Sequence, residues 1–469
     1  MIKICKRALN RFQVYSYKGD VRLCGWMRDM YLGNLIDNTV EELFNNESAL
    51  RIRNRLAKQD YSMCMSDSCP YIANGSIEKM LVDYDPKQRF PEELALGFEN
   101  TCNYACTGCT FHSKANGKNR DDLEKNYQII ENHLREAMQY AKSITANGCG
   151  ELFASAHILR LLSEWEPIAP KEEVCASLET NGSLFDESHW EKIENLGQYD
   201  LSVSISVMSF KEDIYQYLSG TILPVKRIED NLRFVKSLRD SGVINHLELC
   251  TVVQEQNFRE MPDFARRCVE EFGADSVRLR PYAAWGAEKP DVAWFKNPRN
   301  PKHPLYNEYK RVMADPIFSH PKVDDWSGGQ DSEDVSDSPY EIEKKSFAVL
   351  NYLWQNSDEV LKKLSELTPN NNGKIAVYGA TDISKAIVEK LCSSEKFSVE
   401  YMIDRDCTDW YYLDKRIWRH IHLDEQDKDL LVIITLFESE DEITRFLRNK
   451  GYDHIVCLRE IVKINQMSF

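Results

Sequence analysis

Between Glu93 and about Gly286, short runs of apolar and β-branched residues alternate with longer amphipathic stretches. The apolar runs are, in order, LALGFEN, EVCASLETNG, DLSVSISVM, HLELCTVVQ and DSVRLRPY. The longest amphipathic stretch extends from Asp121 to about Ser143, and RIEDNLRFVKSLRDSG and EMPDFARRCVEEFG follow it. Alternating strand and helix patterns predict a parallel sheet with helical crossovers. About six such units favour a partial (β/α)6 barrel over a closed eight-stranded one, in a domain spanning 86–320.

The sequence on either side of this region has a different character. Residues 1–85 hold a stretch with helical spacing, VEELFNNESALRIRNRL, and predict a small separate domain. The segment DDWSGGQDSEDVSDS is acidic and poor in apolar residues, so we expect a solvated linker over 321–345. Further on, KIAVYGATDISKAIVEKL reads as strand, glycine turn and helix, and FSVEYMIDRD and DLLVIITLF read as strands. We therefore predict a helical lead-in and a second α/β domain over 346–469.

Charge and hydropathy exclude several classes of partner. The 469-residue chain carries a formal net charge of −16, which argues against attraction of the whole molecule to nucleic acid or anionic lipid. It contains no run of about 18 apolar residues that would span a membrane. The first residues, MIKICKRALNRF, lack the apolar core of a signal peptide. We expect a cytoplasmic protein with no membrane or nucleic-acid partner.

The chain has 14 cysteines, and half of them are clustered. In a long cytoplasmic chain, clustered cysteines more often bind metal or do chemistry than form disulfides. The seven clustered residues form a loop set and an N-terminal set: Cys102, Cys106 and Cys109; Cys5, Cys24, Cys64 and Cys69. The other seven are scattered in mostly apolar surroundings, where cysteine behaves as a small buried apolar residue.

The loop set, CNYACTGC, directly follows a predicted strand. Thiolates are soft ligands that favour iron–sulfur clusters, zinc or copper(I). A [4Fe–4S] cluster usually takes four thiolates, so three would leave one iron open to a small molecule. A structural zinc loop is the alternative, although such sites normally have four ligands.

The Cys-x3-Cys-x2-Cys spacing at the end of a first strand resembles the radical S-adenosylmethionine (SAM) superfamily. In that family the open iron chelates the amino and carboxylate groups of SAM, and an electron from the cluster cleaves the sulfonium C–S bond. The 5′-deoxyadenosyl radical then takes a hydrogen atom from the substrate. The resemblance covers about residues 93–286 and implies that Cys102, Cys106 and Cys109 are the catalytic, cluster-binding residues.

Further motifs follow successive strands in the order of this family. Gly148-Cys149-Gly150-Glu151 resembles its GGE motif, Thr180-Asn181-Gly182 its TNG motif, and Ser204-Ile205-Ser206 stands where the family has Ser-Ile-Asp. The family also places an aromatic residue against adenine directly after the middle cysteine, where this chain has Thr107 and Phe111 is the candidate substitute. The implied SAM-binding residues are Gly150, Glu151, Thr180, Asn181, Ser204, Ser206 and Phe111. Each motif taken alone is also compatible with an ordinary turn at a strand end.

Two arginines, Arg278 and Arg280, alternate on one face of the sixth strand. Inside a barrel mouth they would suit a carboxylate or phosphate, and on an edge strand they would only be solvated.

The N-terminal cysteines flank a predicted hairpin, the LGN turn of YLGNLIDN and a helix. This order resembles the auxiliary-cluster domain called SPASM, or its shortened form twitch, although that domain normally follows the barrel. The resemblance implies one auxiliary [4Fe–4S] cluster held by Cys5, Cys24, Cys64 and Cys69 without an open iron. A zinc site made by the same cysteines is the alternative. Cluster potentials span a wide range, so the direction of electron flow stays open.

In the C-terminal domain, the turn at Gly379 has one glycine where a dinucleotide fingerprint has three. Asp404 ends the second strand, near the usual ribose-binding position. The domain resembles Rossmann-like modules attached to sugar-modifying and nucleotide-sugar enzymes. This implies a degenerate nucleotide- or sugar-phosphate-binding module, with a purely structural role as the alternative.

These resemblances together imply an oxidoreductase- or isomerase-type radical SAM enzyme with an auxiliary cluster as electron relay. Its reductant would be a donor such as flavodoxin or ferredoxin. The C-terminal domain favours a carbohydrate or sugar-nucleotide substrate, oxidised or epimerised at carbon. Two alternatives stay open, a peptide-modifying SPASM maturase and a non-catalytic zinc-binding interaction protein. The sequence does not determine the substrate, the fate of SAM or the oligomeric state.

Overall fold

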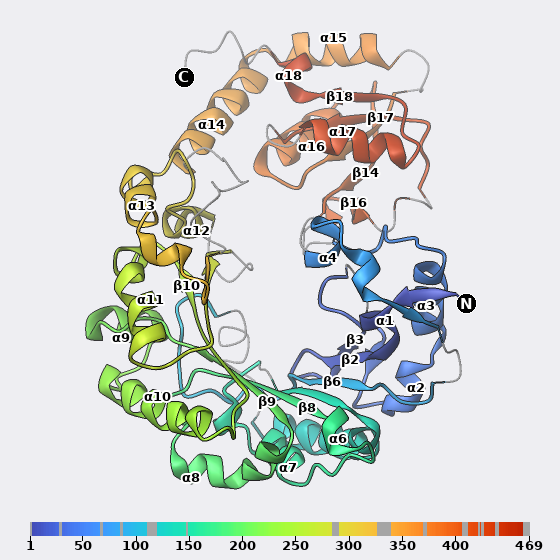
Figure 1. Ribbon diagram of the computed structural model, residues 1–469. Coiled ribbons are helices and arrows are strands. Elements are labelled where there is room, and N and C mark those ends of the chain that lie inside the picture. Colours follow the sequence, from blue (N-terminus) through green and yellow to red (C-terminus); the bar gives the residue numbers. More distant parts are fainter. Residues whose placement is uncertain are drawn as a thin grey trace. The chain divides into compact units, whose positions relative to one another are not determined.

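The chain forms two compact units, Met1–Glu333 and Asp334–Phe469, and each is described by itself (Figure 1). The computed structural model describes residues 2–27, 31–65, 69–84, 88–109, 120–146, 149–283, 290–325, 339–368, 373–405, 411–420, 423, 426–436 and 440–462.

The described part of the first unit contains one ten-stranded sheet and one two-stranded sheet. Eight strands of the larger sheet are parallel, and seven of them follow one another in the chain and lie side by side in that order. These seven are β6 (Glu93–Leu96), β7 (Ser143–Ala146), β8 (Cys175–Thr180), β9 (Asp200–Ser206), β10 (His246–Val253), β11 (Ser276–Pro281) and β12 (Val323–Asp325). Strands β6 to β11 confirm the predicted partial barrel, and β12 extends it by one strand.

Strand β12 comes from the segment 321–345, which the sequence predicts to be a linker. Val323 is in register with Val277 of β11, so the beginning of this segment is part of the sheet. Its end lies in helix α14 (Pro339–Gln355), and residues 326–338 are outside the described residues. Regular structure therefore takes up both ends of the predicted linker.

Helices connect successive strands and cover one face of the sheet (Figure 1). They are α6 (Arg120–Tyr140), α7 (Ala156–Ser163), α8 (Glu187–Trp190), α9 (Glu212–Ser219), α10 (Val225–Asp240) and α11 (Met261–Glu270), followed by α12 (Pro290–Lys296) and α13 (Tyr306–Val312). Helix α6 ends earlier than the predicted position near Ser143. The amides of Lys142 and Ser143 both donate to the carbonyl of Glu92, at 2.9 and 3.0 Å, and this starts β7.

The two faces of the sheet differ in polarity. Along β9, Leu201, Val203 and Ile205 are buried in the core that the helices share, whereas the serines between them point to the opposite face. Alternation of this kind follows from the two-residue period of a strand. The polar face continues across the sheet, since Ser204 is in register with Glu248 of β10.

The N-terminal residues belong to the same sheet as the barrel. β2 (Arg11–Val14) pairs in parallel with β6, and β3 (Asp20–Arg22) and β4 (Gly33–Asn34) continue as antiparallel strands. β1 (Lys3–Cys5) and β5 (Leu81–Asp83) form the two-stranded sheet, and α1 (Lys6–Asn10) and α4 (Pro70–Ala73) are short helices. Parallel pairing through β2 places this domain directly beside the first barrel strand.

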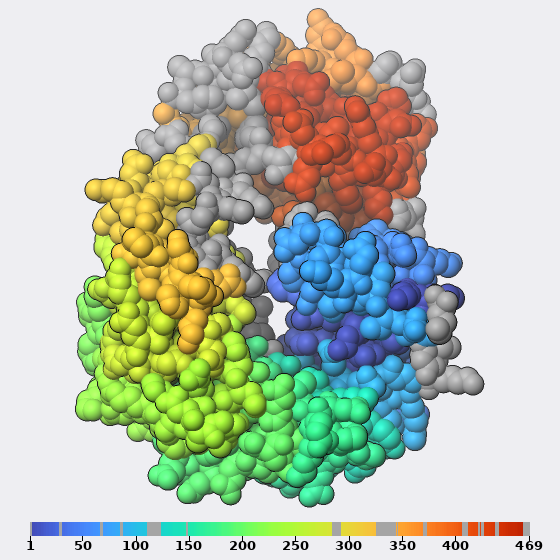
Figure 2. All heavy atoms as spheres, viewed as in Figure 1, coloured from blue at the N-terminus to red at the C-terminus, as the bar shows by residue number. Residues whose placement is uncertain are grey.

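The helical stretch predicted over VEELFNNESALRIRNRL is two helices, α2 (Val40–Phe44) and α3 (Glu47–Ala57). The break occurs because the Asn46 side chain accepts a hydrogen bond from the Ala49 amide at 2.9 Å, which caps the second helix. The domain also packs on α6, where His133 Nδ1 donates to the Leu35 carbonyl at 2.6 Å. Figure 2 shows the N-terminal residues, in blue, continuing onto the cyan surface of the barrel.

The second unit is built on a six-stranded sheet in its described residues. Its strands are β13 (Lys374–Tyr378), β14 (Ser398–Ile403), β15 (Tyr411–Tyr412), β16 (Lys415–Trp418), β17 (Leu431–Ile434) and β18 (Ile455–Cys457). Its helices are α14, α15 (Ser357–Leu367), α16 (Asp382–Cys392), α17 (Glu440–Asn449) and α18 (Leu458–Ile461). The parallel strands lie in the order β16-β14-β13-β17-β18, that is 3-2-1-4-5 along the chain, an order typical of doubly wound sheets.

Candidate functional site

The three-cysteine loop follows β6 and is held by the end of α9. The amide of Ala105 donates to the Ser219 carbonyl at 2.9 Å, and the amide of Thr107 donates to the Leu218 carbonyl at 3.1 Å. Gly220 ends α9 with φ +61° and leaves no room for a side chain, because a Cβ would lie 2.7 Å from the Ala105 carbonyl carbon. The sequence analysis missed this support, for which the only local signal was a helix-ending glycine.

The thiols of this loop lie close enough to influence one another. Burial, with smaller contributions from the neighbouring Cys102 and Cys109 thiols, raises the pKa of Cys106 to about 12. The Tyr104 amide donates to Cys102 Sγ at 3.4 Å. Repulsion of this kind disappears when thiolates bind a cation, so three soft donors in one loop fit a [4Fe–4S] cluster as its ligands.

No three His, Cys, Asp or Glu side chains in the described ranges gather tightly enough to hold a single metal ion. A four-iron cluster distributes its thiolates over different irons, so its ligand set is wider than the shell of about 2.3 Å that sulfur atoms form around one zinc ion.

The turn after β7 is joined to the cysteine loop through the backbone. The Glu151 amide donates to the Thr101 carbonyl at 2.8 Å. Gly150 packs so closely on the same segment that a Cβ would lie 2.9 Å from the Glu99 carbonyl oxygen, 2.8 Å from the Asn100 carbonyl carbon and closer still to the Thr101 oxygen. Gly148 lies outside the described residues.

The Glu151 carboxylate is 1% exposed and accepts three hydrogen bonds. Its Oε1 accepts from the Thr180 hydroxyl and from the Phe153 amide at 3.2 Å, and its Oε2 accepts from the Asn181 amide at 2.7 Å. Burial raises the pKa of Glu151 in spite of these donors. A carboxylate has about four acceptor positions, so one position on Oε2 is left for a further donor.

The strand-end residues after β8 also contact the loop. Asn181 Nδ2 donates to Asn103 Oδ1 at 3.0 Å, and Asn103 Nδ2 donates to the Ser183 hydroxyl at 2.8 Å. The structure thus brings together Gly150, Glu151, Thr180 and Asn181 with the cysteine loop, from the ends of three strands, β6, β7 and β8.

The predicted residues on β9 have other partners. The Ser204 hydroxyl donates to Glu248 Oε1 at 2.9 Å, and the Ser206 hydroxyl lies 3.4 Å from the Cys250 sulfur. Glu248 also pairs with Arg278, with 2.7 Å between Oε2 and Nη2. The sequence analysis missed Glu248, although a carboxylate inside the apolar run HLELC was a signal for a paired buried charge.

Arg278 and Arg280 lie on the polar face of the sheet. Arg278 Nε is 3.7 Å from Asp324, and Arg280 Nη2 is 3.8 Å from Glu248. Both arginines face carboxylates of their own chain, and such contacts are compatible with a barrel mouth as well as with an edge strand.

The position after the middle cysteine, Thr107, has a polar partner in α12. Lys296 is 5% exposed, and its ammonium donates to the Thr107 hydroxyl at 3.3 Å. Phe111, the expected adenine contact, lies outside the described residues.

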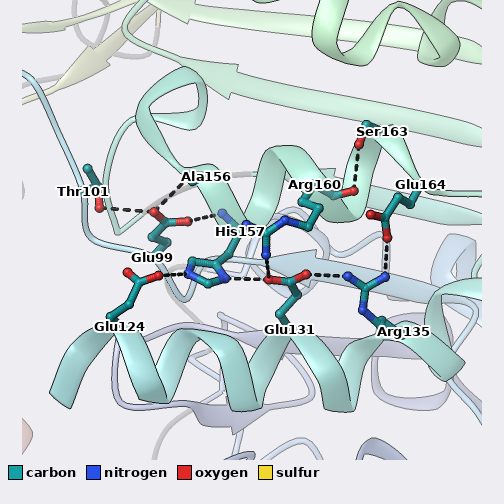
Figure 3. A network of polar contacts seen from close by, with 10 residues as sticks. All are labelled: Glu99, Thr101, Glu124, Glu131, Arg135, Ala156, His157, Arg160, Ser163 and Glu164. Atoms are coloured by element: carbon teal, nitrogen blue, oxygen red, sulfur yellow. Dashed lines mark hydrogen bonds and ion pairs between the residues drawn. The ribbon is translucent and has the colours of Figure 1, made fainter. Parts of the chain in front are cut away.

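A buried network of charged groups supports the segment before the cysteines (Figure 3). Glu99 accepts from the amides of Ala156 and His157 at 3.1 and 3.0 Å, which fixes the start of α7 to the end of β6. The His157 ring in turn contacts Glu131 at 2.5 Å and Glu124 at 2.9 Å. The cysteine loop therefore begins from a rigidly held backbone.

The four N-terminal cysteines also converge. Burial, with smaller contributions from Cys24, Cys5 and Cys69, raises the pKa of Cys64 to about 12. Cys64 pairs with Met27 in an isolated antiparallel bridge, and the Cys69 amide donates to the Met65 carbonyl at 2.7 Å. Four thiols in mutual electrostatic contact fit a cluster with one thiolate on each iron.

The glycine turn of the second unit is occupied by its own side chains. The Ala380 amide donates to Asp404 Oδ2 at 2.9 Å, and Thr381 and Ser384 form a capping box at the start of α16. A Cβ at Gly379, where φ is +112°, would lie 2.9 Å from the Ser384 oxygen. A carboxylate at this helix start opposes the binding of a phosphate there.

A search for membrane spans among the described helices found none of sufficient length and apolarity.

Comparison with known proteins gives two family matches. Residues 98–268 match the radical SAM superfamily, and residues 5–70 match SPASM, an iron–sulfur cluster-binding domain. No curated protein matches the chain.

Two solved structures show distant likeness. SuiB of Streptococcus suis bound to S-adenosylmethionine is 15% identical with a TM-score of 0.30, over 62% of this chain and 66% of its own. The radical S-adenosylmethionine methyltransferase TsrM of Kitasatospora setae, with cobalamin and a [4Fe–4S] cluster bound, is 14% identical with a TM-score of 0.28, over 41% of this chain and 37% of its own. On the two family matches, this chain carries a radical SAM domain over residues 98–268 and a SPASM-type iron–sulfur domain ahead of it.

Proposed function

We propose that this chain is an enzyme that cleaves SAM reductively and uses the resulting radical to take hydrogen from a carbohydrate or sugar-nucleotide substrate, which is oxidised or epimerised. The single observation that supports it best is the direct connection between the cysteine loop and the Gly150–Glu151 turn. The electron enters from a small donor such as flavodoxin or ferredoxin.

Three residues hold the active cluster in this proposal, Cys102, Cys106 and Cys109. When bound, the cluster supplies the electron that breaks the C–S bond of SAM. The chain's own groups bind and orient the cofactor around it. Glu151 accepts a hydrogen bond from the SAM ammonium at the acceptor position left on Oε2, and the ammonium supplies the counter-charge that a buried carboxylate requires.

Thr180 orients Glu151 through its hydroxyl. Asn181 and Asn103 present amide groups beside the loop that suit ribose hydroxyls or the SAM carboxylate. We assign Lys296 and Thr107 to the adenosine side, because they stand at the position where the family has its aromatic residue.

The substrate assignment rests on the polar face of the sheet and on the second unit. Half-buried hydroxyls repeat across this face: Thr145, Ser177, Ser202, Ser204 and Ser206. Groups that both donate and accept match the hydroxyls of a sugar. The 3-2-1-4-5 strand order supports a Rossmann-like second unit, although the contacts of Asp404 favour a structural role for its glycine turn.

The test is anaerobic purification followed by iron and sulfide analysis and incubation with SAM and dithionite. The proposal expects about eight irons per chain and formation of 5′-deoxyadenosine. Cys106→Ala should abolish 5′-deoxyadenosine formation and remove about four irons. Cys268→Ala, which alters a buried cysteine away from both sets, is the matched control and should retain both. Two zinc ions per chain and no cleavage of SAM would reject the proposal.

A further inference from the structure

Two arginines of the N-terminal domain, Arg11 on β2 and Arg22 on β3, lie beside the auxiliary cysteines. Arg22 is the last residue of β3 and precedes Cys24 by two residues. Gly25 next to Cys24 leaves space for the guanidinium, since a Cβ there would lie 3.3 Å from Arg22 Nη2. Arg11 begins the strand that pairs with β6.

Neither guanidinium has a carboxylate partner within 4 Å in the described part of the chain. Arg22 Nε donates to the uncharged Gln13 Oε1 at 3.1 Å, and its guanidinium carbon lies 4.5 Å from the centre of the Tyr15 ring. Arg11 Nε is buried without a hydrogen-bond partner. Glu93, in register with Arg11, pairs with Lys6 at 3.4 Å.

Both arginines are electrostatically coupled to thiols. Burial lowers the pKa of Arg22, and Tyr15, Cys24 and Cys149 oppose that lowering. Burial and the Arg7 charge lower the pKa of Arg11, and Glu93, Cys24 and Glu179 oppose that lowering. A partly buried cation gains from nearby negative charge, and an anionic group at Cys24 would supply it to both arginines.

A four-iron cluster with four thiolate ligands supplies such an anion, and its negative charge increases by one when it accepts an electron. Cations beside it stabilise the more negative state. We propose that Arg11 and Arg22 raise the reduction potential of the auxiliary cluster and so make it an electron acceptor. This inference rests on the proposed function, because it assumes that Cys5, Cys24, Cys64 and Cys69 hold the cluster.

The consequence is a net oxidation of the substrate. The 5′-deoxyadenosyl radical takes a hydrogen atom from a carbinol C–H bond and becomes 5′-deoxyadenosine, leaving a carbon radical. That radical loses its hydroxyl proton to solvent and one electron to the auxiliary cluster, and a C=O bond forms. One SAM is consumed in each turnover. The substrate loses one electron and one proton as the hydrogen atom, and then a second electron and a second proton when the C=O bond forms.

Arg22 is also electrostatically coupled to the buried Cys149 thiol. Cys149 Sγ donates to the Tyr15 carbonyl at 3.3 Å and to the Gly97 carbonyl at 2.8 Å, beside the end of β6. Burial, with a smaller contribution from Cys109, raises the pKa of Cys149 to about 12.

The experiment measures the potential of the auxiliary cluster alone. The full-length chain with Cys102, Cys106 and Cys109 all changed to alanine serves as background and should retain about four irons. Redox titration followed by electron paramagnetic resonance then compares Arg22→Gln and Arg11→Gln with the background. Arg22→Lys keeps the charge, and Arg51→Gln removes an exposed arginine of the same domain.

Each glutamine variant should shift the reduction equilibrium at least tenfold toward the oxidised cluster, which is about 59 mV for one electron. Arg22→Lys and Arg51→Gln should shift it by less. Potentials of both glutamine variants equal to the background, with four irons retained, overturn the inference. If Arg22→Gln loses iron, Arg11→Gln decides by the same criterion. Failure of the proposed function looks different, because the unmodified chain would then form no 5′-deoxyadenosine.

Discussion

Substitution of Gly150 by alanine tests whether the turn after β7 really fixes the cysteine loop. Gly150 does not have a positive φ, so alanine is compatible with its backbone and the effect is purely steric. The added Cβ would meet three backbone atoms of residues 99–101, none of which can rotate away.

The magnitude follows from two terms. Overpacking of this kind costs about 1–3 kcal/mol. Separation of the two segments also breaks the 2.8 Å hydrogen bond from the Glu151 amide to the Thr101 carbonyl, which contributes about 1 kcal/mol. We expect the free energy of unfolding of the first unit to fall by about 2–4 kcal/mol.

The assay is equilibrium urea unfolding of the cluster-free protein, with the two units followed as separate transitions because a chain of this kind need not unfold in one step. Gly108→Ala is the control, since it lies in the same loop and a Cβ there meets nothing within 4 Å among the described residues. Iron content and 5′-deoxyadenosine formation should fall in Gly150→Ala and not in the control. Equal unfolding curves for the two variants would refute the role assigned to this contact.

Three other outcomes are expected. Glu151→Gln should weaken SAM binding at least tenfold by equilibrium dialysis, since loss of a charge-assisted hydrogen bond costs about 1.5–3 kcal/mol; unchanged binding would remove the ammonium assignment. Glu131→Ala leaves the partners of a buried carboxylate uncompensated and should cost about 3–5 kcal/mol in urea unfolding, whereas the exposed Glu164→Ala should cost under about 1 kcal/mol; similar losses would contradict the network in Figure 3. Hydrogen bonds from Ser62 and Arg55 hold the pKa of Asp60 at about 2 in the folded protein. The ionised Asp60 therefore stabilises the fold slightly at any pH above the pKa that this carboxyl has in the unfolded chain. This stabilisation disappears as the pH falls through about 2. Urea unfolding of the cluster-free protein and of Asp60→Asn should be compared between about pH 5 and pH 2. The difference between their free energies of unfolding should shrink as the pH falls, and a constant difference would contradict the role assigned to Asp60.

The barrel was predictable because its strands and helices carry their own periodicity. From Leu201 to Ser206, β9 alternates apolar and hydroxyl residues, and α10 was predicted from its sequence alone. Boundaries were less predictable where a distant partner decides them. Helix α6 ends at Tyr140 because Glu92, far away in the sequence, accepts the next amides, and β12 exists only because β11 offers an edge.

The candidate site divides in the same way. Cys102, Cys106 and Cys109 lie within eight residues, so the chain itself keeps the three thiols close and the spacing alone indicated the chemistry. Other residues of the site gave weak sequence signals or none, because their roles depend on contacts with distant residues. Glu248 pairs with Arg278, Gly220 packs on the Ala105 backbone, and Lys296 donates to Thr107.

By itself, the sequence determined which donors are present and their order along the strands, because ligand type and short loop spacing are local properties. It also predicted that four further cysteines form a second set. Only the tertiary structure decided where that set stands. Pairing of β2 with β6 places it beside the first barrel strand, with Arg11 and Arg22 next to Cys24. Such contacts join residues on separate strands through hydrogen bonds and burial, and no local pattern encodes them.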